Sequence, residues 1–122
     1  MNRYDHYKTL TIRRHDQGIV EVIMGGPGRL ATADHSGHKE LATVWRDISD
    51  DPHARVAILR GEGKGFSAGG DFGLVTDMAN DFAVRTRVWK EARDLVYNVI
   101  NCDKPIVSAM HGPAVGDRKS VV

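Results

Sequence analysis

The sequence is poor in cysteine and has no long apolar run. Cys102 is the only cysteine, which excludes an internal disulfide and fits a reducing compartment. No stretch approaches the roughly 18 apolar residues that a membrane-spanning helix needs. The polar start "MNRYDHYKTLTIRRHDQG" also lacks the apolar core of a signal peptide. We therefore expect a cytoplasmic protein that does not bind a membrane.

An excess of charge of one sign is also missing. The 17 Lys and Arg residues nearly balance the 16 Asp and Glu residues, so the formal net charge is +1. Without a basic stripe, nothing favours nucleic acid as a partner. A chain of 122 residues forms one domain with one modest core. The expected partner is a small molecule or another protein.

Apolar residues recur with clear periods along the chain. The β-rich runs "YKTLTIRR" and "GIVEVIM", joined by the polar turn "HDQG", predict an antiparallel hairpin. Helical spacing predicts one amphipathic helix over residues 34–51, capped by Asp34 or Ser36, and a second over residues 82–102. These segments supply most of the expected core.

Two further runs predict strands between and after the helices. "RVAILR", residues 55–60, has the composition of a strand covered on both faces, and "KPIVSAM" predicts a second buried strand. Trp45 and Trp89 lie on the apolar stripes of the two helices and are expected in the core. The alternation of strands and helices indicates an α/β fold with right-handed crossovers.

The glycine-rich stretch "GEGKGFSAGGDF", residues 61–72, follows the first of these strands. Glycine serves where φ is positive or where a ligand approaches the backbone closely. The stretch does not fit a G-x-x-x-x-G-K-[ST] phosphate loop, because Lys64 is followed by Gly65. "GKGFSA" matches the dinucleotide pattern G-x-G-x-x-A only weakly, since no helix is indicated at once after it. Composition alone explains the glycines equally well as turn residues.

Two motifs together carry a more specific signal. "VAILRGEGKGFSAGGDF" and the later "CDKPIVSAMHGPAVG" resemble the enoyl-CoA hydratase/isomerase (crotonase) family, which has an F-[SC]-A-G-x-D loop and a K-P-x-[VI]-x-A-[VI]-x-G-x-x-x-G segment. "MGGPGRLATADHSGHKEL" is similar to a third family segment. The resemblance implies a crotonase-like α/β fold of ββα units, with residues 1–122 as its N-terminal part. It also implies an acyl-CoA thioester as substrate, no separate cofactor and a homo-oligomer, trimer or hexamer.

The resemblance also implies a site. Family members hold the oxygen of a thioester enolate with two backbone N–H donors, an oxyanion hole. It assigns the first donor to Gly70 and the second to position 117, where this chain has Asp117. Contacts with the coenzyme and the acyl group are expected from Arg29, Ala31, Ser67, Ala68, Gly69, Asp71 and Phe72. Among these, the guanidinium of Arg29 suits the coenzyme phosphates.

The last six residues, "DRKSVV" (117–122), depart from the family pattern. The carboxylate of Asp117 beside a developing oxyanion is electrostatically unfavourable. Ser120 stands where hydratases place their first water-activating glutamate, so the acid/base pair for hydration is missing. We therefore expect a truncated, inactive form of such an enzyme. The alternative is a non-catalytic fragment that binds acyl-CoA or associates with related chains.

Other polar residues favour structural roles. His35 and His38 have the H-x-x-H spacing of metal ligands, but no third ligand lies nearby in the sequence, so a solvated helix end is the better interpretation. His111 is expected to be a hydrogen-bonded structural residue. Cys102 ends a predicted helix without a basic neighbour, which argues against a nucleophilic role.

Overall fold

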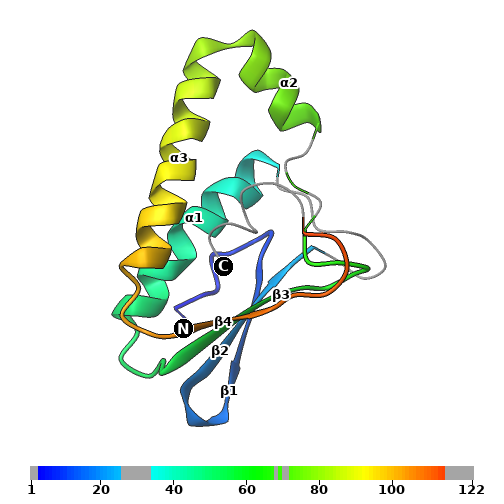
Figure 1. Ribbon diagram of the computed structural model, residues 1–122. Helices are drawn as coiled ribbons and strands as arrows, with labels where there is room; N and C mark the ends of the chain where they lie inside the picture. The colour runs from blue at the N-terminus through cyan, green and yellow to red at the C-terminus, as the bar shows by residue number, and fades with distance from the viewer. Residues whose placement is uncertain (1–2, 26–33, 68, 70–71, 115–122) are drawn as a thin grey trace.

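The protein forms a four-stranded sheet with helices packed against one of its faces (Figure 1). The structure, a computed structural model, describes residues 3–25, 34–67, 69 and 72–114. The strand order is β1-β2-β3-β4. β1 pairs antiparallel with β2, whereas β2, β3 and β4 run parallel to one another. The strands span Thr11–His15, Ile19–Met24, Val56–Gly61 and Ile106–Ala109.

The predicted hairpin is confirmed. β1 and β2 are joined by a 3-10 turn over Asp16–Gly18, in which Gln17 has φ 68° and Gly18 has φ 80°. A Cβ at Gly18 would lie 2.9 Å from the His53 carbonyl oxygen. Glycine is therefore required here both by the left-handed backbone and by the close approach of the chain that enters β3.

The first predicted helix is confirmed as α1, His35–Asp50. The Asp34 side chain caps it by accepting a hydrogen bond of 2.7 Å from the Gly37 N–H. Its apolar stripe is buried against the sheet, and Trp45 is only 1% exposed, as predicted. The buried residues of α1 are Leu41, Ala42, Val44, Trp45 and Ile48.

The second predicted helix is confirmed as α3, Phe82–Ile100, with Asp81 as its cap. Val88 and Leu95 are its buried residues. Trp89 is 62% exposed, so the prediction that it lies in the core is wrong. The apolar residues of α3 fall on two faces, and α1 covers only one of them.

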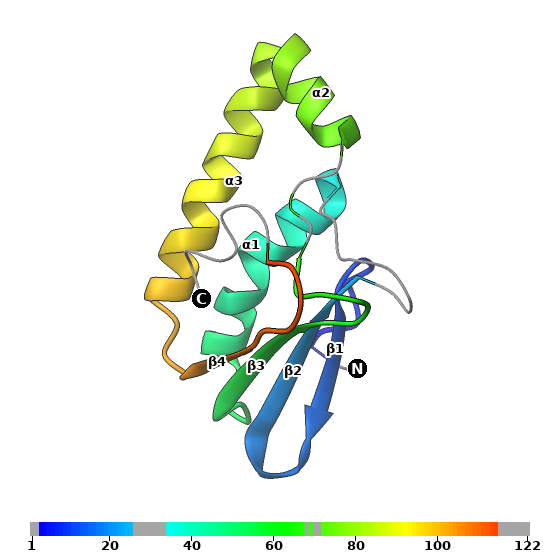
Figure 2. The ribbon, with the colours of Figure 1, turned by 45° about the vertical axis from the view of Figure 1, so that its right-hand side comes forward.

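A further helix, α2 over Phe72–Asn80, was not predicted. It is short, it contains Gly73, and Leu74 is its only buried residue, so it gives little periodic signal. α2 packs against α3, and in Figures 1 and 2 it projects with the beginning of α3 beyond the sheet. None of the helices in the described ranges has the length and apolarity needed to cross a bilayer.

The described residues cover only one face of the sheet well. Alternate strand residues point toward α1 and form the core with it, among them Val20, Val22, Met24, Ala57 and Leu59. On the opposite face Ile23 is buried, but Ile58 is partly exposed and Val107 is 51% exposed. The prediction that the strand over residues 55–60 is covered on both faces is therefore wrong for this part of the chain.

A buried carboxylate joins several segments at the end of α1. Asp51 is 1% exposed, and its Oδ2 accepts hydrogen bonds from the Tyr4 hydroxyl at 2.7 Å and from Arg14 Nη2 at 3.0 Å. Its Oδ1 accepts from the His53 N–H at 2.9 Å, and its carbonyl oxygen accepts from Lys104 Nζ. Burial alone would raise the pKa of Asp51, but these hydrogen bonds and the Arg14 charge lower it below its usual value.

We expect the Asp51→Asn variant to lose about 3 kcal/mol of unfolding free energy, because it leaves Arg14 without its anionic partner. Urea denaturation at neutral pH measures the loss, with Asp50→Asn as the exposed control. The pKa of Asp51 is 3.8 in an unfolded chain and lower in the folded one. Its contribution is therefore full above about pH 5 and is lost progressively as the pH falls through the unfolded-state and then the folded-state value. Equal stability of the two variants would contradict this role.

Candidate functional site

Two segments that carry the glycine motifs lie side by side beyond the carboxyl ends of β3 and β4. The regular pairing of these strands ends at Arg60 and Ala109, but a parallel bridge forms again between Ser67 and Ala114. The N–H groups of Phe66 and Ser67 both donate to the Pro113 carbonyl oxygen, at 2.9 and 3.0 Å. The two motifs therefore form one structural unit, although they are far apart in the sequence.

Two glycines make this contact possible. A Cβ at Gly61 would lie 2.3 Å from the Gly65 carbonyl oxygen, because the loop folds back over the end of β3. Gly112 has φ 60°, and a Cβ there would lie 2.5 Å from the Lys64 carbonyl oxygen. Both positions thus exclude a side chain through backbone contacts within the protein.

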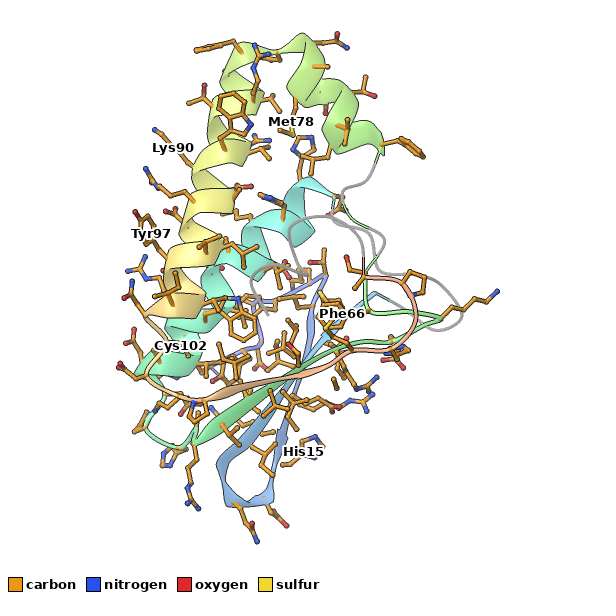
Figure 3. The ribbon with its side chains drawn as sticks, in the orientation of Figure 1. His15, Phe66, Met78, Lys90, Tyr97 and Cys102 are labelled. Atoms are coloured by element: carbon orange, nitrogen blue, oxygen red, sulfur yellow. The ribbon has the colours of Figure 1, made fainter. Side chains whose placement is uncertain are left out.

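The end of the loop is buried and held by its own side chains. Phe66 and Ser67 are fully buried, and Figure 3 shows Phe66 beside the crossing of the loop and the strands. Ser67 Oγ accepts a hydrogen bond of 3.1 Å from the Gly69 N–H, and Gly69 has φ 90°. The Ser67 hydroxyl therefore holds the Gly69 backbone N–H.

His111 adds a further bond between the two segments. Its Nε2 lies 3.0 Å from the Gly63 carbonyl oxygen. This confirms the prediction that His111 is a hydrogen-bonded structural residue. The same edge of the sheet includes the end of β2, because the Glu62 N–H donates to the Met24 carbonyl oxygen at 2.8 Å.

Most of the predicted site residues lie outside the described residues: Arg29, Ala31, Ala68, Gly70, Asp71 and Asp117. Of the others, Ser67 and Gly69 form the turn described above. Phe72 is the first residue of α2, and it is 88% exposed. The structure thus brings together Ser67 and Ala114, which precede the predicted donor positions 70 and 117 in the sequence.

The two histidines of the H-x-x-H pattern bind separate partners. His35 Nε2 lies 2.8 Å from Asp77 Oδ2 of α2, and its Nδ1 lies 2.5 Å from Arg87 Nη2 of α3. His38 Nδ1 lies 2.8 Å from Glu91 Oε1 of α3. In the described part of the chain, no group of three or more His, Cys, Asp or Glu side chains could hold a metal ion.

These contacts connect the start of α1 to both later helices, and sequence reasoning missed them. The spacing of His35 and His38 shows that they share one helix face. It carries no information on partners some forty to fifty residues away, such as Asp77, which belongs to the helix that was not predicted.

Backbone N–H donors held in place can stabilise an oxyanion. The described residue closest to the predicted donor is in the buried turn at the end of the loop, where the Gly69 N–H donates to Ser67 Oγ. This turn lies outside the carboxyl ends of parallel strands, where ligands bind in open α/β sheets.

Comparisons with known proteins agree with this arrangement. Residues 14–117 match the family model for enoyl-CoA hydratase/isomerase. A mitochondrial Delta(3,5)-Delta(2,4)-dienoyl-CoA isomerase of Dictyostelium discoideum is 27% identical over 90% of this chain and 41% of its own length. The human mitochondrial protein of the same name is 28% identical over 92% of this chain and 37% of its own length.

Solved structures show the same similarity. An enoyl-CoA hydratase/isomerase from Mycobacterium paratuberculosis has a TM-score of 0.85 and 34% identity, covering 93% of this chain and 45% of that one. A beta-diketone hydrolase from the cyanobacterium Anabaena has a TM-score of 0.82 and 26% identity, covering 97% of this chain and 47% of that one.

The match includes both glycine motifs up to residue 117, and the fold is the one that the resemblance implied. The chain spans less than half of the length of these relatives. By sequence and by fold, it belongs to the enoyl-CoA hydratase/isomerase family.

Proposed function

We propose that this chain binds the thioester group of an acyl-CoA at the turn after β3, with the Gly70 N–H as an oxyanion donor. The observation that supports the proposal is the bridge between Ser67 and Ala114, which holds the two motif segments together. Family membership supports the choice of an acyl-CoA as ligand. Coenzyme A enters as part of the substrate, and no separate cofactor is proposed.

The proposed chemistry is stabilisation of an enolate. When a thioester enolate forms or is protonated, negative charge gathers on its oxygen, and a fixed N–H at that point is worth roughly 3 to 4 kcal/mol. The bond between Gly69 N–H and Ser67 Oγ holds the chain immediately before Gly70. Two successive glycines without a Cβ let the thioester approach the backbone closely.

Two features limit the reactions that residues 1–122 can catalyse. They are the aspartate at the second donor position and the lack of an acid/base pair. Asp117 keeps a backbone N–H, but its carboxylate opposes negative charge on the substrate oxygen. Ser120, at the position of the first hydratase glutamate, offers no carboxylate to activate water. We therefore propose that these residues bind acyl-CoA without hydrating it.

A second candidate is the shift of a double bond along the acyl chain. It is favoured because relatives that match 90% or more of this chain are named dienoyl-CoA isomerases. Such a shift uses the same stabilised enolate but moves a proton between carbon atoms and adds no water. Turnover of a conjugated dienoyl-CoA, with none of an enoyl-CoA, would distinguish it from hydration.

The cellular compartment and the oligomeric state of the protein also stay predictions. Matched relatives are named as mitochondrial, so family membership does not favour the cytoplasm over an organelle. A homo-oligomer is proposed from the family alone.

Replacing Gly70 by proline removes the proposed donor N–H. We expect the Gly70→Pro variant to bind crotonyl-CoA about tenfold more weakly, the loss of roughly one hydrogen bond to a carbonyl oxygen. Titration calorimetry measures the affinity. A butyl thioether of coenzyme A, which has no carbonyl oxygen, is the matched control, and its affinity should not change. Equal weakening with both ligands would contradict the donor role.

The close packing of the two segments gives a separate prediction. A methyl group at residue 112 collides with the Lys64 carbonyl oxygen, so Gly112→Ala should lose about 2 kcal/mol of unfolding free energy and weaken crotonyl-CoA binding. Gly73→Ala, at an exposed position of α2, is the control and should be neutral or slightly stabilising. Unchanged binding and stability of Gly112→Ala would show that the segment contact is not needed.

The absence of an acid/base pair predicts binding without turnover. We expect crotonyl-CoA to bind to the 122-residue chain while its enoyl absorbance stays constant, because positioned acid and base groups each contribute typically about 10²- to 10⁴-fold. Binding is followed by calorimetry and hydration by absorbance on the same sample. Hydration at an enzyme-like rate would require an acid and a base elsewhere in the chain.

A further inference from the structure

The segment before β1, residues 3–10 and here called the strap, contains no helix or strand but is packed against the rest of the protein. Its side chains Tyr4, Tyr7 and Leu10 are buried and belong to the hydrophobic core. Figure 1 shows this segment, in dark blue, beside α1 before the chain enters β1. The strap is therefore an ordered part of the core and not a free chain end.

Three carboxylates along α1 and at its end hold the strap. The Tyr7 hydroxyl donates to Asp47 Oδ2, and the Tyr4 hydroxyl donates to Asp51 Oδ2 at 2.7 Å. The third carboxylate is that of Glu40, which accepts hydrogen bonds from the strap backbone. At 3.6 residues per turn, positions 40, 47 and 51 lie within about 40° of arc. The three carboxylates therefore form one row, here called the acidic row, that faces the strap.

Glu40 binds three successive N–H groups of the strap. Its Oε1 accepts from the N–H groups of Thr9 and Leu10 at 2.9 and 3.1 Å and from Thr9 Oγ1 at 2.9 Å. Its Oε2 accepts from the Lys8 N–H at 3.0 Å. Hydrogen bonds to an ionised acceptor are roughly twice as strong as bonds between neutral groups. A protonated carboxyl loses that charge and turns one oxygen into a donor, so it cannot make all of these bonds.

The acidic row decides whether the strap is ordered. Ordering eight residues costs backbone entropy at every one of them, whereas only Tyr4, Tyr7 and Leu10 gain from apolar burial. The bonds to the carboxylates must supply the rest. Regular pairing of β1 begins only at Thr11, so the strap can leave without breaking a pair of the sheet. Terminal segments of this kind open locally while the rest of a protein stays folded.

Cations surround only the Asp51 end of the acidic row. Arg14 of β1 lies 3.0 Å from Asp51 Oδ2, and Arg3 of the strap adds a second positive charge. Protonation of Asp51 leaves these two cations without their carboxylate, which favours the departure of the strap. Lys104 Nζ bonds to the Asp51 carbonyl oxygen, so that contact does not depend on protonation.

The pKa values of the row place the release in acid. Burial alone would raise the pKa of Glu40, but the N–H groups of the strap lower it below its usual value of 4.5. The pKa of Asp51 is lowered in the same way. Both contributions are therefore full above about pH 5.5 and are lost progressively below it. His6 Nε2 lies 3.5 Å from Asp47 Oδ2, but this side chain is exposed, so its charge opposes the release only weakly.

We propose that the strap is an acid-sensitive conformational switch. The ionised carboxylates of Glu40, Asp47 and Asp51 hold residues 3–10 against α1, and their protonation releases the strap as one unit while the sheet stays folded. Release withdraws Tyr4 and Tyr7 from the core and makes the apolar surface that they cover accessible, which favours association. This inference does not depend on the proposed function.

Amide hydrogen exchange of the 122-residue chain tests the switch. Between pH 7 and about pH 3.5, and after correction for intrinsic exchange rates, protection of the Lys8, Thr9 and Leu10 amides should fall at least about tenfold. The amides of Val20 and Val22 are the reference and should keep their protection, because β2 is paired on both sides. Undiminished protection of the strap, or an equal loss in β2, would overturn the proposal.

Glu40→Gln imitates the protonated carboxyl with little change of shape. We expect it to lower the protection of the strap amides at pH 7 by at least about tenfold and to weaken their dependence on pH. Asp50→Asn, at an exposed position of α1, is the control and should leave the strap unchanged. Protection in Glu40→Gln equal to that of the control would contradict the role of the acidic row.

Tyr7→Phe tests whether the strap leaves as one unit. It removes the hydroxyl that bonds to Asp47 and leaves the bonds to Glu40 in place. Release as a unit predicts that the Lys8, Thr9 and Leu10 amides still lose protection in this variant. Their unchanged protection would overturn the proposal. This variant also decides the matter if Glu40→Gln loses the circular dichroism of the folded chain.

Discussion

The parallel pairing of β3 and β4 is the constraint on which the candidate site depends. Parallel strands end at the same edge of a sheet, so their following loops necessarily start side by side. Here the pairing continues past the strands to Ser67 and Ala114 and is reinforced by two hydrogen bonds to the Pro113 carbonyl oxygen. Gly61 and Gly112 permit this contact because any side chain at either position would collide with backbone atoms. The described part of the loop end is thus held by contacts within the protein.

The hydrophobic core that supports this edge lies on only one face of the sheet. α1 and α3 pack on the same face of the sheet, and the buried Asp51 joins the N-terminal segment, β1 and the entry to β4 at the opposite end from the loops. As a result, apolar side chains remain exposed in the described residues, among them Val107 on the far face of the sheet and Trp89 on α3.

Family membership and chemistry rest on different parts of the chain. The fold and the motif pair are carried by residues 14–117, and they are shared with enzymes named as hydratases, isomerases and hydrolases. One scaffold hosts several reactions because the reaction depends on the few groups placed around the stabilised oxygen. The match ends at position 117, where this chain has an aspartate.

The sequence by itself determined the hairpin, the two long helices, the core position of Trp45 and, through two glycine motifs, the family. These features depend on local periodicity, capping and turn residues, all of which act over a few neighbouring positions. Tertiary structure decided that Trp89 is exposed, that Phe72–Asn80 is helical, and that His35 and His38 contact different helices. The physical reason is that periodicity shows which residues share a face, whereas the packing of distant segments decides which face is covered and which side chains meet.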